Sequence, residues 1–339
     1  MTREYRPAWW LPDPHTATLW GRLGRREPRA HSPQLPVTTE RWDTPDGDFV
    51  ELVRLKGPTD PATPRLLLLH GLEGGLHSHY VRAMFREAQA RGWAADLLLF
   101  RSCGSEPNRL PRSYHSGETS DPLWVITQLR QTFPSAPLGV VGVSLGGNVL
   151  CKLLGELGER AASLIRGAAA MSVPYDLARA SRQIGRSFGT VYEQFFLKSL
   201  IPKALGKINR HAELAGLHPV SRVRTLWDFD DAFTAPVHGF ASAADYYARA
   251  SSLPYLDQIA VPTLLLNAVD DPFLPPEVLS EVQTVVANGS SDHVKTEFPA
   301  RGGHVGFTAG RWPWSAWYYG EWRAAEFLAQ TFSATKARP

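Results

Sequence analysis

The sequence predicts an α/β fold in which a mostly parallel central sheet is flanked by helices and carries a helical lid insertion. Short apolar segments alternate with amphipathic segments between residues 66 and 173, a pattern typical of parallel strands joined by crossover helices. The alternation stops between residues 174 and 247, where apolar and aromatic residues recur at helical spacing. It resumes at 261–268 with another short apolar run, which indicates a return to the sheet.

Two strands, at 37–42 and 49–55, are expected to pair antiparallel before the alternation begins. Further strands are expected at 66–70, 95–100, 138–143, 168–173, 261–268 and 294–298, and helices near 79–91, 118–132, 145–160 and 177–210. We therefore divide the chain into an N-terminal arm (1–36), a core (37–173 and 248–339) and a helical lid (174–247). Because such sheets bind ligands at the carboxyl ends of their strands, functional side chains are expected in the loops at that edge.

The run Gly142-Val-Ser144-Leu145-Gly146 lies between an apolar strand and a helical segment. A G-x-S-x-G run in that position is typical of a nucleophile elbow, a strained turn that exposes the serine hydroxyl. The amide of Leu145 and the positive end of the following helix can stabilise an oxyanion there. Although G-x-S-x-G also recurs by chance in loops, the flanking strand and helix favour Ser144 as a catalytic nucleophile.

A serine nucleophile needs a base and an acid that orients the base, in the chain order Ser, Asp, His for this kind of sheet. His304 lies among glycines after the strand expected at 294–298, and we expect it to be the base. Asp270 and Asp271 follow the strand expected at 261–268. Asp271 begins a D-x-x-[VIL]-P run and is the expected acid, while Asp270 stays the alternative, since one of the two shapes the turn.

A second oxyanion donor is expected in the loop His70-Gly-Leu-Glu-Gly-Gly75, where Gly71 permits a tight turn and the amide of Leu72 can face Ser144. The loop matches neither G-x-x-x-x-G-K-[ST] nor G-x-G-x-x-G, so a phosphate loop is not indicated.

The lid insertion is expected to form an apolar acyl pocket over the nucleophile, and Phe195 and Phe196 are its candidate substrate-binding residues. The alternative for most of its aromatic residues is that they pack the lid against the core.

Seven motifs occur in order along most of the chain: His70-Gly-Leu-Glu-Gly-Gly75 with His77-Ser-His-Tyr80, Arg101-Ser-Cys-Gly-Ser-Glu-Pro-Asn-Arg109, Tyr114-His-Ser-Gly-Glu118, Gly142-Val-Ser-Leu-Gly-Gly-Asn148, Asp228-Phe-Asp-Asp231, Asp270-Asp-Pro-Phe273 and Gly302-Gly-His-Val-Gly-Phe307. Together they resemble the YheT-like branch of the α/β-hydrolases, which is related to the abhydrolase-domain proteins 1, 2 and 3 and to plant embryogenesis-associated hydrolases. The resemblance implies an α/β-hydrolase fold, a triad matching Ser144, Asp271 and His304, and esterase or lipase-like activity on acyl esters, lipid-like ones included. In one departure, Ser102 stands where the family usually has glycine, which concerns a local turn.

Composition excludes several other classes of protein. With 36 basic and 33 acidic residues the net charge is +3, and no long basic run indicates a nucleic-acid partner. Cys103 and Cys151 offer no disulfide framework, which favours a reducing, cytoplasmic location. No run approaches the roughly 20 apolar residues of a membrane span, so a soluble protein with at most peripheral membrane contact is expected. The Arg22-to-Arg29 segment is expected to be solvated or to tolerate a membrane surface. No H-E-x-x-H or C-x-x-C run indicates a metal site.

The expected reaction is hydrolysis of a small-molecule acyl ester through an acyl-enzyme, for which no cofactor is needed. Two alternatives stay open: transfer of the acyl group, or thioesterase action, with the same triad, and a non-catalytic binding protein that keeps the fold. The oligomeric state is not predicted.

Overall fold

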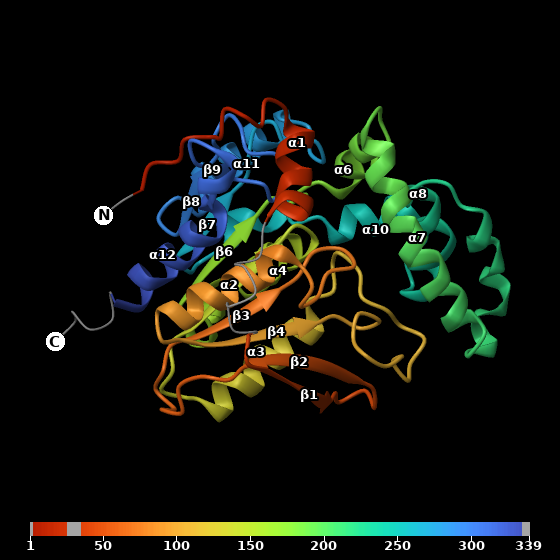
Figure 1. The fold of residues 1–339 in the computed structure, drawn as a ribbon. Helices are drawn as coiled ribbons and strands as arrows, with labels where there is room; N and C mark the ends of the chain where they lie inside the picture. The colour runs from red at the N-terminus through yellow and green to blue at the C-terminus, as the bar shows by residue number, and fades with distance from the viewer. Residues whose placement is uncertain (1–2, 26–34, 334–339) are drawn as a thin grey trace.

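The computed structural model describes residues 3–25 and 35–333, and it contains one large sheet. Its strands are β1 (Val37–Asp43), β2 (Phe49–Leu55), β3 (Arg65–Leu69), β4 (Ala94–Leu99), β5 (Leu138–Val143), β6 (Gly167–Met171), β7 (Thr263–Leu266) and β8 (Val294–Glu297). They lie in the order β1-β2-β4-β3-β5-β6-β7-β8 (Figure 1). The pairs β1·β2 and β2·β4 are antiparallel and the remaining pairs are parallel, which confirms the predicted mostly parallel sheet.

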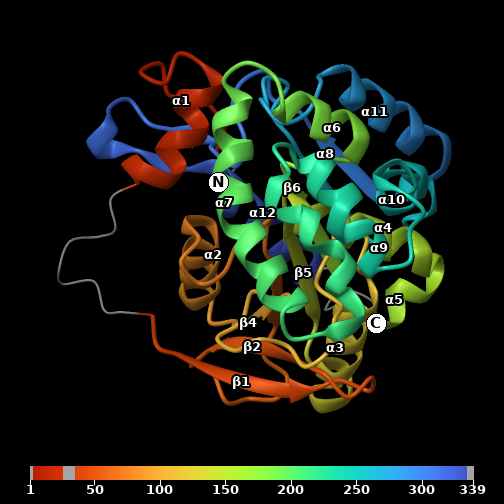
Figure 2. The ribbon, with the colours of Figure 1, turned by 90° about the vertical axis from the view of Figure 1, so that its right-hand side faces the viewer.

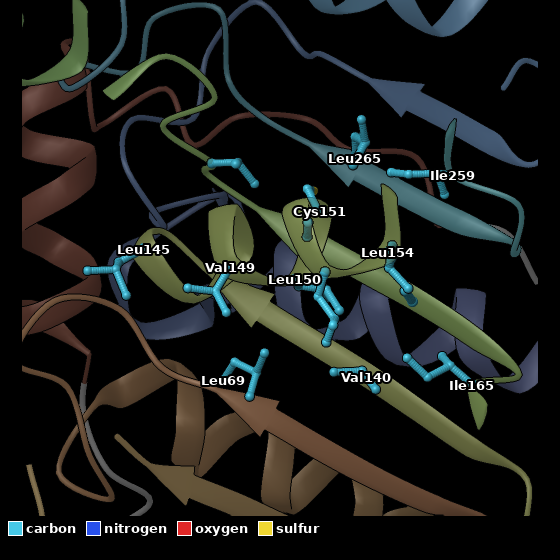
Figure 3. Close-up of a cluster of buried hydrophobic side chains, with 14 of the residues drawn as sticks. Leu69, Val140, Leu145, Val149, Leu150, Cys151, Leu154, Ile165, Ile259 and Leu265 are labelled. Carbon is cyan, nitrogen blue, oxygen red and sulfur yellow. The ribbon is translucent and has the colours of Figure 1, made fainter. Parts of the chain in front are cut away.

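Helices cover both faces of the sheet because successive residues of a strand point to opposite faces. Leu66 and Leu68 of β3 belong to a core with α2 (His79–Ala90) and α12 (Tyr319–Ser333), whereas Leu67 and Leu69 belong to a second core. The second core is covered by α3 (Ser120–Thr132), α4 (Leu145–Leu157) and α11 (Glu277–Gly289). Figure 3 shows α4 lying over this face of β3 and β5. Fully buried apolar strands of this kind hold the sheet as a rigid platform for the loops at its carboxyl edge.

The chain between β6 and β7 is helical and lies beyond the carboxyl ends of the strands, in front of the sheet in Figure 2. Its helices are α6 (Leu177–Ile184), α7 (Gly189–Ile208), α8 (Leu226–Phe229), α9 (Ala235–Val237) and α10 (Ala243–Ala250). The single helical segment expected at 177–210 is thus two helices, broken where Ser187 has a φ of 48°. The lid boundary expected after residue 247 falls inside α10, so the insertion extends to the end of that helix.

The N-terminal arm contains α1 (Pro14–Leu19), and residues 1–2, 26–34 and 334–339 lie outside the described residues. The second half of the Arg22-to-Arg29 segment, residues 26–29, therefore lies outside the described residues, and the prediction for this segment stays a prediction. Within the described ranges, none of the helices has the length and apolar composition that a membrane crossing requires. The remaining short elements are the helical turns η1 (Trp20–Gly24), η2 (Gly158–Arg160), η3 (Ala212–Arg222), η4 (Asp230–Thr234), η5 (Leu253–Gln258) and η6 (Pro313–Ser315), the helix α5 (Ala161–Leu164), and the paired strands β9 (Thr308–Ala309) and β10 (Trp317–Tyr318).

Candidate active site

Ser144 occupies a sharp turn between β5 and α4, with φ 54° and ψ −120°. Two glycines let the elements around this turn approach closely. A Cβ atom on Gly146 would lie 2.4 Å from the carbonyl oxygen of Leu69, and one on Gly142 would lie 2.3 Å from the carbonyl oxygen of Gly146. No larger residue fits at either position without moving the backbone. The G-x-S-x-G pattern therefore has a direct packing cause.

His304 contacts both Ser144 and Asp271. The Nε2 atom of His304 lies 3.0 Å from the hydroxyl oxygen of Ser144. Its Nδ1 atom lies 2.9 Å from one carboxylate oxygen of Asp271 and 3.1 Å from the other. A carboxylate at Nδ1 favours the imidazole tautomer whose Nε2 is free to accept the serine proton. The arrangement can therefore activate the hydroxyl of Ser144 as a nucleophile.

The two neighbouring aspartates have different partners. Asp271 is 4% exposed and also accepts a hydrogen bond from the amide of Phe273. Asp270 accepts hydrogen bonds from the amides of Gly302 and Gly303, each 2.8 Å long, and makes no contact with the ring of His304. Burial raises the pKa of Asp270 above its ordinary value. The structure thus brings Asp271 to His304 and uses Asp270 to hold the backbone of the loop that carries it.

The loop of His304 is also held by residues that sequence reasoning did not single out. The amide of His304 donates to the hydroxyl of Thr18 in α1, at 2.9 Å, and the next amide donates to the hydroxyl of Ser172. The ring of Phe273 stacks on the imidazole of His304, with centroids 4.1 Å apart. Thr18 belongs to the N-terminal arm, so the arm is part of the site's support. No motif quoted from the sequence includes Thr18, so nothing in the pattern drew attention to it.

The predicted oxyanion donors, Leu72 and Leu145, come from two different elements near Ser144. Leu145 is the first residue of α4, so its amide has no carbonyl partner within the helix, and Leu72 follows β3. Both residues line the same cavity as Ser144 and His304. A Cβ atom on Gly71 would lie 3.2 Å from the Cβ atom of Ser144, which shows how closely the Leu72 loop passes the serine.

Two side chains hold the loop of Leu72 in place. The buried ring of His70 bonds to the carbonyl of Gly71 through Nδ1 and accepts the amide of Phe100 at Nε2, and burial lowers its pKa to about 4. Glu73, at φ 55°, accepts hydrogen bonds from Tyr114 and Ser199 and pairs with Lys203 at 2.7 Å. Because Ser199 and Lys203 belong to α7, Glu73 joins this loop to the helical insertion. The sequence analysis did not identify Glu73 as a structural link.

The cavity at Ser144 has a volume of about 140 Å³ and is lined largely by apolar residues of the helical insertion, Phe196 among them. Phe195 does not line it. Its side chain is 45% exposed, and the guanidinium group of Arg22 lies 4.1 Å from its ring centroid. Adjacent residues of a helix point about 100° apart, so only one phenylalanine of the pair faces inward. The expectation that Phe195 lines an acyl pocket is therefore corrected, and Phe196 alone is kept.

The turn at Ser102, where the family usually has glycine, forms with serine in place. It has a φ of 71°, a left-handed conformation that glycine adopts without strain. Its amide donates to the side chain of Asn108 at 2.7 Å, which holds the turn in place with serine present.

Charged side chains in the cavity wall are few. Glu73 and Lys203 pair with each other, Asp271 is shielded behind His304, and Asp230 lines the wall on the side of the insertion. In residues 3–25 and 35–333 no group of three or more His, Cys, Asp or Glu side chains could hold a metal ion.

Residues 64–308 match a family model described as the alpha/beta hydrolase fold. Over 313 residues the chain is 37% identical to the Escherichia coli (strain K12) protein named "Putative esterase YheT", covering 91% of this chain and 88% of that protein. Over 326 residues it is 28% identical to Homo sapiens Phospholipase ABHD3, covering 94% of this chain and 77% of that protein. The solved structure of the Pyrococcus furiosus esterase Pf2001 has a TM-score of 0.56 at 16% identity, over 90% of this chain and 96% of that one, a similarity of fold alone.

Proposed function

Because the chain belongs to the α/β-hydrolase family, we propose that it is a serine hydrolase that cleaves carboxylic acyl esters through an acyl-enzyme on Ser144. The observation that carries the proposal is the continuous contact from Asp271 through His304 to the hydroxyl of Ser144, with distances of 2.9 and 3.0 Å. All three residues meet at the carboxyl edge of the sheet, at the mouth of a largely apolar cavity.

The mechanism follows from this geometry. His304 takes the proton of Ser144 as its oxygen attacks the ester carbonyl, and Asp271 stabilises the imidazolium that forms. The amides of Leu72 and Leu145 stabilise the oxyanion, and one such donor is typically worth about 10²–10³ in kcat. His304 then protonates the leaving alcohol, which departs and leaves the acyl group on Ser144. A water molecule, deprotonated by His304, attacks this acyl-enzyme and releases the carboxylic acid.

The substrate class is a small-molecule ester with an apolar acyl group. The cavity beside Ser144 suits such a group because ten of the residues that line it are leucine, isoleucine or phenylalanine. The relatives named as an esterase and as a phospholipase support the same class. A cytoplasmic location with peripheral membrane contact stays part of the proposal. The location rests on the use of cysteine. The membrane contact rests on apolar side chains exposed at the N-cap of α7, Phe188, and on the helix itself, Val191 and Phe195.

A fluorophosphonate probe and a panel of p-nitrophenyl esters from acetate to palmitate test the proposal. We expect the probe to add once, on the peptide that contains Ser144, and to abolish ester hydrolysis in proportion to labelling. Heat-denatured protein is the control and should not react. Labelling of another residue, or hydrolysis that survives complete labelling, would contradict the proposed nucleophile.

Phe196 and Phe195 form a matched pair for testing the acyl pocket. Phe196→Ala is expected to lower kcat/KM for long-chain esters more than for short-chain esters, since each buried methylene is worth about 0.8 kcal/mol. Phe195→Ala removes the same side chain outside the cavity, so its chain-length profile should match that of the wild type. Measured profiles that change equally in the two variants would contradict the assignment of Phe196.

Thr18→Val tests the support from the N-terminal arm. Valine has the shape of threonine but cannot accept the hydrogen bond from the amide of His304. We expect kcat to fall by about tenfold and the free energy of unfolding to fall by about 1–3 kcal/mol, the usual cost of an unsatisfied buried amide. Thr18→Ser keeps the hydroxyl and should restore kcat. If kcat is the same in both variants, the arm does not position His304.

A further inference from the structure

Two acids line the cavity beside Ser144 without a part in the proposed reaction, and only one of them, Glu73, is paired with a cation. The other is Asp230. Asp230 begins the turn η4 and lies in the Asp228-Phe-Asp-Asp231 motif. Its Oδ1 atom accepts a hydrogen bond from the hydroxyl of Thr234 and its Oδ2 atom accepts one from the hydroxyl of Tyr247, both 2.6 Å long. A carboxylate can accept about four hydrogen bonds, so each oxygen keeps an unused acceptor site. Asp230 retains accessible surface and lines the cavity.

Asp230 has no cationic partner among the residues that the structure describes, because its recorded contacts are the two neutral hydroxyl groups. Lys203 also lines the cavity, but it pairs with Glu73. His115 and His238 line the same wall, and burial lowers the pKa of both rings, that of His115 to about 3. A carboxylate out of water without a counter-charge is costly. Burial accordingly raises the pKa of Asp230 to about 6.

Aromatic rings surround this acid. Phe229 ends α8 directly before Asp230, and Phe233 lies three residues after it in η4. From α10, Tyr247 bonds to Asp230, and the ring of Tyr246 lies beside that of Tyr247. All four line the cavity, and the centroids of the two tyrosine rings lie 5.1 Å apart. The face of an aromatic ring attracts cations, and the attraction grows where water is excluded. The wall therefore combines one unpaired negative charge with several electron-rich rings.

We propose that Asp230 and these four rings form a subsite for a positively charged ammonium group of the ester substrate, whose carbonyl lies at Ser144. A cation fits better than a hydroxyl group because it would neutralise the charge of Asp230 and would also be attracted to the faces of the rings, and neither attraction requires an N–H donor. This inference rests on the proposed function, and it adds a substrate class to it: acyl esters that carry an ammonium group within reach of the ester.

Two esters of the same shape test the subsite: the choline ester and the 3,3-dimethylbutyl ester of one fatty acid, which differ in having a quaternary nitrogen or a quaternary carbon. At pH 7.5 we expect the wild type to prefer the choline ester by at least about tenfold in kcat/KM, as a desolvated charge pair usually gives. Asp230→Asn should bring this ratio close to one through a loss of kcat/KM for the choline ester.

The neighbouring acid supplies the control. Asp231 accepts a hydrogen bond from the amide of Ala243 and is not among the cavity residues. Asp231→Asn therefore removes the same charge from the same motif and should keep the wild-type ratio. A wild-type ratio near one would overturn the subsite, and so would an equal loss of preference in both variants. The wild type could instead prefer glycerol esters over both test esters. If Asp230→Asn removes that preference, Asp230 binds hydroxyl groups, and the ammonium subsite is overturned.

The pH dependence of the ratio is a second readout. Around Asp230 the titratable groups are Tyr246 and Tyr247 of α10, His115, and His238, which bonds to the carbonyl of Thr234. Burial raises the pKa of both tyrosines and lowers that of both histidines, so these groups stay neutral near pH 6. Asp230 is charged above its pKa of about 6, so the ratio should fall as the pH drops through that value. Any effect of pH on the triad applies to both esters and cancels in the ratio. A ratio that is constant from pH 5 to pH 8 would count against the subsite.

Binding of tetraethylammonium, measured by calorimetry, separates failure of the subsite from failure of the proposed function. Binding that is weakened at least about tenfold by Asp230→Asn would support the subsite even in a protein that hydrolyses no ester. If neutral esters are hydrolysed through Ser144 but the wild type binds no ammonium ion, the proposed function stands and the subsite is wrong. Melting temperatures of the Asp230 and Asp231 variants show that each is folded.

Discussion

Replacing Ser144 by alanine is expected to lower kcat for ester hydrolysis by about a million-fold, as loss of the nucleophile does in serine hydrolases that act through a triad. Labelling by the fluorophosphonate probe should disappear. Alanine tolerates the positive φ of 54° no worse than serine does, and the change removes one oxygen that contacts only His304. The melting temperature should therefore change by no more than a few degrees.

The control for this variant is Ser280→Ala, which removes an exposed hydroxyl on α11 that does not line the cavity. It should keep full activity when purified in the same way. Any hydrolysis left in the Ser144 variant must be compared with that control, because a trace of contaminating esterase would resist the substitution. Activity above about a hundredth of the wild-type rate, in protein shown to be homogeneous, would contradict the proposed mechanism.

The central strands β3 to β7 were predictable because they are buried on both faces, and a buried parallel strand is a short, largely apolar run. The segments expected at 49–55 and 138–143 coincide with β2 and β5, and the others differ from the observed strands by a few residues at their ends. Ends are the least certain part because end residues are held by caps and loops rather than by the periodic pattern.

The contacts of Ser144, Asp271 and His304 could be anticipated because each follows a strand of the same parallel sheet, and carboxyl ends of such strands share one edge. Support from Thr18 could not be anticipated. It joins α1 to a loop 286 residues further along the chain, and no periodicity or spacing records such a contact. The orientation of Phe195 was missed because α7 carries apolar residues around most of its circumference, so the pattern does not show which side faces the cavity.

Asp271→Asn is expected to lower kcat by about ten thousand-fold, although the side chain keeps its shape. The amide group can donate a hydrogen bond to Nδ1 of His304, which places the ring proton on Nε2. That nitrogen then points its N–H at Ser144 and cannot accept the serine proton. The loss of negative charge also removes the group that stabilises the imidazolium. Binding of substrate should change little, because Asp271 lies behind His304 and is 4% exposed.

Asp270→Asn is the matched control, since it makes the same chemical change one residue away. The side-chain oxygen of asparagine can still accept the hydrogen bonds from Gly302 and Gly303, so the loop of His304 should keep its position. We expect kcat to fall by less than about tenfold, with a loss of stability of about 1 kcal/mol from the weaker, uncharged acceptor. Measuring kcat, KM and the melting temperature of both variants separates orientation of the base from support of its loop. A larger loss of kcat in the Asp270 variant would mean that the backbone carried by Asp270, rather than the carboxylate at Nδ1, limits the reaction.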